Sequence, residues 1–153
     1  MKDADIPRPC ACTSVRRVAR LLARTYDSAL ARSGMTVTQL AVLRAIERHA
    51  GESLSRVADD LVMDRTTLYR ALAVLRKCGW VELEEGRDAR SRSAYITSGG
   101  HRALSKAHPG WAATQVALIG KFGAFRWRQF VRDMAFLTEC VDSLRADQEE
   151  QAQ

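Results

Sequence analysis

The chain has 153 residues, of which 46% are hydrophobic and 27% charged, and it carries a formal charge of +6. This length suits one domain, or one small domain with an added oligomerisation element, and the composition excludes a wholly disordered chain. No apolar run approaches the roughly 18 residues of a membrane-spanning helix, and the N-terminus lacks the apolar stretch of a signal peptide. We therefore expect a cytoplasmic protein with no membrane partner, whose basic charge permits a polyanionic partner.

An irregular arm and a long helix are predicted first. Pro7 and Pro9 suit the arm. Thr13 or Ser14 can cap a helix that ends at Gly34, because apolar residues recur between them at helical spacing.

Three further helices are predicted next. Residues 36–39 form a capping-box pattern at the start of one helix, and Gly51 ends it. A short helix follows over about 53–61. After a brief turn, Asp64 caps another helix, and Gly79 supplies its left-handed C-terminal turn.

A β-hairpin follows these helices, since the apolar period changes from helical spacing to two. Residues 80–84 alternate like a half-buried strand, 86–92 form a polar, Arg-rich turn, and 94–97 form the return strand.

The rest of the chain is predicted to be helical from about residue 97 or 98. Pro109 and Gly110 should kink or interrupt the helix after His108, and Gly120 and Gly123 mark a bend. The last helix carries an apolar seam spaced 3, 4, 3, 4, 3, which is typical of a dimer interface. Packing of this seam against the first helix is the alternative. The seam consists of Trp127, Phe130, Met134, Leu137, Val141 and Leu144.

The order of these elements predicts a winged helix-turn-helix, in which the second helix of the pair reads the major groove and the hairpin is a wing. The candidate DNA-reading residues of that helix are Asp64, Arg65, Thr66, Thr67, Tyr69 and Arg70. The candidate wing residues are Arg87, Asp88, Arg90 and Arg92. Arginine can pair with guanine in the major groove, and a narrow minor groove attracts it. Alternatives are an ordinary solvated helix and turn, or a winged-helix protein-interaction module without DNA binding.

Residues 36–97 resemble the MarR family of bacterial transcriptional regulators. The matching stretches are 38–43, 57–61, 64–68, 75–81 and the wing sequence 88–90, followed by Ile96 and Thr97. The resemblance implies a homodimer on a palindromic DNA operator, and a repressor released by a small-molecule effector. It also implies that Arg90 enters the minor groove with support from Asp88. The sequence departs from the family pattern at Trp80 and Tyr69.

The expected fold is thus mostly α with a small β-hairpin wing. Residues 1–34 would form the N-terminal arm and a dimerisation helix, and residues 35–98 the winged helix-turn-helix domain. Residues 99–147 would form the C-terminal dimerisation helices, and residues 148–153 a disordered tail.

Two release signals remain open. A helix N-terminus lowers a thiol pKa, so Cys10 and Cys12 are candidates for a redox switch, although a bond between them would be strained. Alternatively, Cys10 and Cys12 pack under the dimer interface as small apolar residues. We expect Cys78 and Cys140 to be core or interface residues.

An effector pocket, in which an aromatic ligand is one option, is the other release signal. It would lie between the dimer helices and the winged domain, with Tyr26, His108 and Trp111 as candidate lining residues. The histidines lack the spacing of a metal site, and no catalytic motif occurs, so we expect no metal, no cofactor and no enzyme activity.

Overall fold

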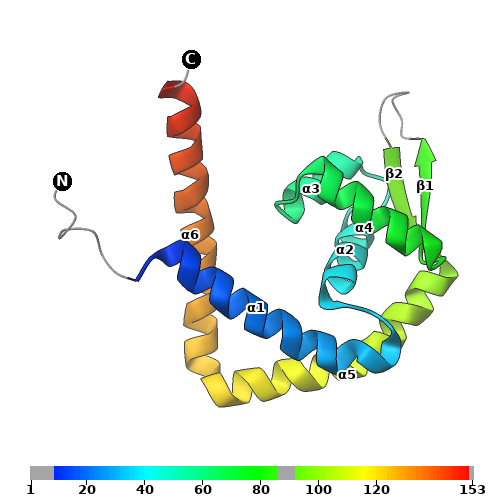
Figure 1. Ribbon diagram of the computed structural model, residues 1–153, viewed down its shortest axis with the longest axis horizontal. Coiled ribbons are helices and arrows are strands. Elements are labelled where there is room, and N and C mark those ends of the chain that lie inside the picture. Colours follow the sequence, from blue (N-terminus) through cyan, green and yellow to red (C-terminus); the bar gives the residue numbers. More distant parts are fainter. Residues whose placement is uncertain (1–8, 86–91, 152–153) are drawn as a thin grey trace. The chain divides into compact units, whose positions relative to one another are not determined.

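The computed structural model describes residues 9–85 and 92–151 and is mostly helical with a two-stranded hairpin, as predicted (Figure 1). The chain divides into two compact units, Met1–Thr114 and Gln115–Gln153. In chain order, the elements are α1 (Ala11–Leu30), the 3₁₀ helix η2 (Ala31–Ser33), α2 (Val37–Arg48), α3 (Leu54–Asp60), α4 (Arg65–Lys77), β1 (Val81–Glu85), β2 (Arg92–Ile96), α5 (Ser98–Phe122) and α6 (Ala124–Gln151).

The first unit is built around one apolar core. Helices α2, α3 and α4 supply most of it, and Val81, Ala94 and Ala107 add residues from β1, β2 and α5. Its largest fully buried side chains are Leu30, Val42, Leu43, Ile46, Val57, Leu68, Leu72 and Leu75. Burying each such side chain contributes about 1.5–3 kcal/mol, so this core fixes the helix pair that carries the candidate site.

The predicted caps of the two longer helices in this core are confirmed. The Gln39 N–H donates to Thr36 Oγ1 at 3.2 Å, and the Thr36 N–H donates to Gln39 Oε1 at 2.8 Å, which completes the capping box. Asp64 caps α4, and Gly79 has a φ of 70° after it. Local sequence signals thus set both helix starts.

Helix α1 begins earlier than predicted. Its N-cap is Cys10 rather than Thr13 or Ser14, and the Ser14 N–H donates to the Cys10 carbonyl at 3.0 Å to close the first turn. Cys10 is extended after Pro9, which suits a residue that precedes a helix. Cys12 consequently lies inside the first turn instead of before the helix.

The hairpin strands are antiparallel, with a register that runs from Val81 opposite Ile96 to Glu85 opposite Arg92. Arg92 therefore belongs to β2 and not to the turn in which it was expected. Its ladder position opposite Glu85 extends the strand by two residues before Ala94. An isolated bridge also joins Ser53 to Ser93 of β2, which ties the hairpin to the start of α3.

Helix α5 runs without interruption through Pro109, so of the kink or interruption predicted after His108, the interruption is wrong. Gly110 packs closely there: a Cβ on it would lie 2.6 Å from the Ala29 carbonyl oxygen. The backbones of α5 and α1 therefore approach each other closely at this point. Gly123, with a φ of 92°, separates α5 from α6.

Helix α6 continues to Gln151, so the disordered tail expected from residue 148 is helical through that residue. Glu and Gln, which fill this end, are good helix formers, and this accounts for the extension. Within the described residues, no helix has both the length and the apolar character that crossing a membrane requires.

Candidate nucleic-acid interface

Helix α4 buries one face in the core and exposes the other. Leu68, Leu72 and Leu75 are each 1% exposed or less. On the opposite face, polar side chains occupy the first two turns. These exposed residues are Arg65, Thr66, Tyr69 and Arg70, all predicted as DNA-reading residues. Their donors, together with the helix N-terminus, present a surface suited to anions and to base edges.

Asp64 and Thr67, also predicted to read DNA, are engaged with each other. The Thr67 N–H donates to Asp64 Oδ1 at 2.8 Å, and the Thr67 hydroxyl donates to Asp64 Oδ2 at 2.5 Å. The Thr67 hydroxyl and then its N–H lower the pKa of Asp64. The carboxylate therefore stays ionised at neutral pH, and the pair fixes the start of α4 rather than extending its donor surface.

A cleft of about 190 Å³ lies beside this helix start. Arg65 and Arg92 line it from α4 and β2, and Ser53 and Ser55 line it from the start of α3. Two guanidinium groups and two hydroxyls in one concavity are suited to a phosphate oxygen. The two serines were missed by the sequence analysis, although the Ser-Leu-Ser start of α3 is a local signal that could have suggested them.

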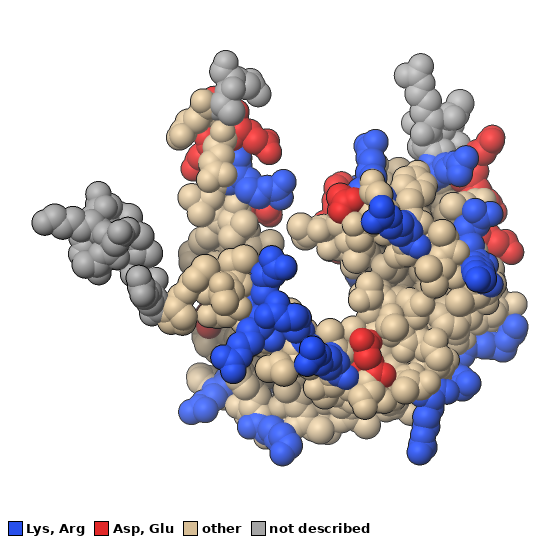
Figure 2. Space-filling view, viewed as in Figure 1, with Lys and Arg blue, Asp and Glu red and all other residues tan. Residues whose placement is uncertain are grey.

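On the face shown in Figure 2, basic side chains lie over α1 and around α3, α4 and the hairpin, and acidic ones lie beside α3 and the hairpin and near the end of α6. Arg92 is exposed at the start of β2. The other predicted wing residues, Arg87, Asp88 and Arg90, lie outside the described residues. The described part of the wing thus contributes Arg92 to the interface.

The predicted effector residues His108 and Trp111 are neighbours on α5, with ring centroids 5.9 Å apart. The guanidinium of Arg44 stacks 4.0 Å from the centre of the Trp111 ring, and burial lowers the pKa of Arg44. A pocket of about 260 Å³ opens beside them. It is lined by Arg44, Glu47, His101, Leu104, Ser105 and His108. Tyr26 is buried, which raises its pKa, and it does not line this pocket.

The four cysteines are free thiols, and Cys10, Cys12 and Cys78 are exposed while Cys140 is half-buried. Cys78 was expected in the core or in an interface, and it does not lie in the core, because it is the exposed C-cap of α4. The pKa of the Cys10 thiol is lowered, chiefly by the backbone N–H of Thr13 and then by the Thr13 hydroxyl. An exposed thiol with a lowered pKa has the properties of a reactive cysteine.

The residues of the predicted apolar seam of α6 range from half-buried to exposed. No described residue of α6 is buried. Trp127, Phe130 and Met134 are half-buried, and the rings of Trp127 and Phe130 pack together 5.9 Å apart. Leu137, Val141 and Leu144, further along the seam, are 38%, 45% and 59% exposed.

In the part of the chain that the structure describes, no three metal-ligating side chains gather at one place.

Comparison with known proteins matches this chain to a family model and to solved structures. A family model described as the MarR family matches residues 33–91. The transcriptional regulator MosR of M. tuberculosis, solved in complex with DNA, is 37% identical; the match covers 90% of this chain and 99% of that chain, with a TM-score of 0.82.

Two more distant structures share the fold. PcaV of Streptomyces coelicolor, solved with its natural ligand, is 17% identical over 89% of this chain and 99% of that chain, with a TM-score of 0.76. S. aureus MepR, solved with DNA, is 16% identical over 89% of this chain and 99% of its own, with a TM-score of 0.73. The comparison with curated proteins gave no match.

Proposed function

Since this chain belongs to the MarR family of transcriptional regulators, we propose that it binds a palindromic DNA operator as a homodimer and represses transcription there. The exposed donor face at the start of α4 is the observation that carries the proposal. The DNA complex of MosR, which matches nearly the whole chain, supports it. A dimer would place two such helices in major grooves about one DNA turn apart.

The residues of the interface divide into two roles. Arg65 and Arg70 would read base edges, with Thr66 and Tyr69 beside them. Arg92, with the serines of the adjoining cleft, would hold a backbone phosphate. The wing residues Arg87, Asp88 and Arg90 extend the proposal to the minor groove, on the strength of the family resemblance.

Substitution of Arg65 tests the base contact. Arg65→Ala should cost about 1–3 kcal/mol of binding free energy at the preferred base pair and relax specificity there. Arg92→Ala should instead weaken binding uniformly across sequences and lower the salt slope by about 1. Fluorescence anisotropy on duplexes selected from a random pool measures both.

The matched control is Arg145→Ala, which removes the same charge from an exposed position on α6. Its affinity should stay near that of the wild type. If the wild type shows no affinity for DNA at low salt, the proposal fails, and a winged-helix protein-interaction module becomes the better account.

Two release signals are compatible with this function. The pocket beside Arg44 and His108, with the Trp111 ring next to it, would take a small-molecule effector. PcaV, a protein of the same fold, was solved with its natural ligand. Alternatively, the Cys10 thiolate would attack a peroxide, giving a sulfenic acid and releasing the other peroxide oxygen as hydroxide or water.

One release assay distinguishes the two signals. If peroxide is the signal, it should dissociate the DNA complex of the wild type, and Cys10→Ser should abolish the effect because the thiolate is gone. Cys78→Ser, at another exposed cysteine, should leave it intact. A wild-type complex that withstands peroxide but dissociates with a small organic ligand would contradict the redox switch and favour the effector pocket.

A further inference from the structure

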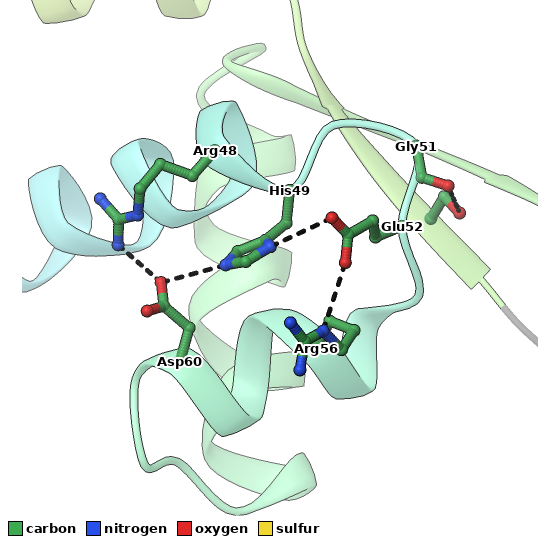
Figure 3. Close-up of polar contacts among 7 residues, drawn as sticks. Arg48, His49, Gly51, Glu52, Arg56 and Asp60 are labelled. Atoms are coloured by element: carbon green, nitrogen blue, oxygen red, sulfur yellow. Dashed lines mark hydrogen bonds and ion pairs between the residues drawn. The ribbon is translucent and has the colours of Figure 1, made fainter.

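His49 ends helix α2 and lies between two carboxylates (Figure 3). Its Nε2 is 3.4 Å from Asp60 Oδ2, and its Nδ1 is 3.4 Å from Glu52 Oε1. The side chain is only 17% exposed. The imidazole is thus held between the turn after α2 and the helix α3.

The protonation state of His49 decides whether both contacts are favourable. A carboxylate only accepts hydrogen bonds, and a neutral imidazole has a single N–H. Nδ1 is shielded from solvent and makes no well-formed hydrogen bond with a described residue. Only the imidazolium, with two N–H groups and a positive charge, matches an anion on each side.

The charged groups around His49 keep both carboxylates ionised. Arg48 of α2 donates to Asp60 at 2.6 Å, and Arg56 of α3 faces Glu52 at 3.3 Å. The pKa of Glu52 is lowered, chiefly by His49 and then by Arg56. Arg48 is the main cause that lowers the pKa of Asp60. At neutral pH the imidazole therefore faces two anions.

The same turn is bonded to the hairpin. The Ser93 hydroxyl of β2 donates to the Gly51 carbonyl at 3.3 Å, and Ser53 forms its bridge with Ser93. Ser53 also lines the cleft that contains Arg65 and Arg92. The position of the turn after His49 therefore affects how α3, α4 and β2 present the cleft.

We propose that His49 is a proton-dependent positioning residue, whose imidazolium clamps Glu52 and Asp60 and holds the DNA-binding surface in place. The proposal rests on the DNA binding proposed above. Because the clamped state binds the proton, its contribution is present at low pH and is lost as the pH rises. DNA affinity and folding stability should both be lower at pH 8 than at pH 6.

The test compares two measurements at pH 6 and pH 8 at constant ionic strength. DNA affinity by anisotropy should be about fivefold to tenfold tighter at pH 6 for the wild type. His49→Gln, which keeps a polar side chain that cannot be protonated, should remove most of this ratio. Glu52→Gln, which retains the imidazole but removes one of its anions, should reduce it. A urea unfolding midpoint without DNA should show the same pattern.

Glu149→Gln is the matched control for Glu52→Gln, because it removes the same carboxylate from an exposed position on α6, away from the turn. It should keep the wild-type ratio. A wild type without pH dependence, or a His49→Gln protein that keeps the wild-type dependence in both measurements, overturns the proposal. If no protein binds DNA at either pH, the proposed function fails. A His49-dependent shift of the urea midpoint then still supports the clamp.

Discussion

Gly100 stands where the start of α5 meets the backbone of the hairpin. A Cβ on it would lie 2.2 Å from the Trp80 carbonyl oxygen and 2.6 Å from Ile96 Cγ2. That carbonyl also accepts the Thr97 N–H at 3.1 Å. Gly100→Ala should therefore shift this junction and cost about 1–3 kcal/mol of unfolding free energy, measured by urea denaturation.

Gly120 provides the control for this prediction. It also lies in α5, but a Cβ there would meet nothing within 4 Å. Gly120→Ala should stabilise by about 0.5–1 kcal/mol, because alanine is the better helix former. Equal effects of the two substitutions would contradict the steric reason given for Gly100.

Single residues were predictable where their partner is close in sequence. The caps at Thr36 and Asp64 each bond to a residue three positions away, so a short pattern reveals them. The contacts around His49 are different, because Asp60 comes from the next helix. The cleft likewise joins Ser53 to Arg92. No local pattern encodes such neighbours, since the tertiary fold brings them together.

The turn between α3 and α4 contains Val62 in a left-handed conformation, with a φ of 50° and a side chain that is 75% exposed. A β-branched residue in this region is strained, and packing that would compensate is largely missing. Asparagine tolerates the conformation, so Val62→Asn should raise the unfolding free energy by about 1 kcal/mol. DNA affinity should not fall.

Val116 is the matched control, since it is 71% exposed but lies in α5. Val116→Asn should change stability by no more than about 0.5 kcal/mol. A Val62→Asn protein that is no more stable than the wild type would show that the turn bears no such strain.

At the scale of elements, the helix pair and hairpin were predicted because their boundaries carry turn and cap residues. The start of α5 was predicted as well, but its continuity past His108 was not, because Pro109 is a local helix breaker, whereas the close approach of Gly110 to Ala29 is a long-range contact. The start of α1 was placed late for a related reason. Serine and threonine are preferred N-caps, and Cys10 gives no such signal.

At the scale of the whole molecule, the exposed apolar residues of α1 and α6 are the surface expected to form the homodimer. On α1, Val15, Val18 and Leu21 are 40%, 49% and 55% exposed. Helix α6 adds Leu137, Val141 and Leu144 of its seam, which are 38%, 45% and 59% exposed. The core of the winged domain contains none of the seam residues. The sequence could therefore indicate that the seam has more apolar residues than that domain needs. It could not give the exposed fraction of each seam residue.

Substitution on the seam tests the dimer. Leu137 and Val141 are successive exposed seam positions, and burying each in a partner would contribute about 1.5 kcal/mol or more. Leu137→Glu with Val141→Glu should therefore shift the protein from dimer to monomer in light scattering coupled to size-exclusion chromatography. Glu139→Lys, exposed on α6 between them, changes charge without touching the seam and should remain a dimer. Because the palindrome would be bound by two linked domains, the monomeric variant should lose about 100-fold or more in DNA affinity. A double variant that stays dimeric would place the interface elsewhere on the chain.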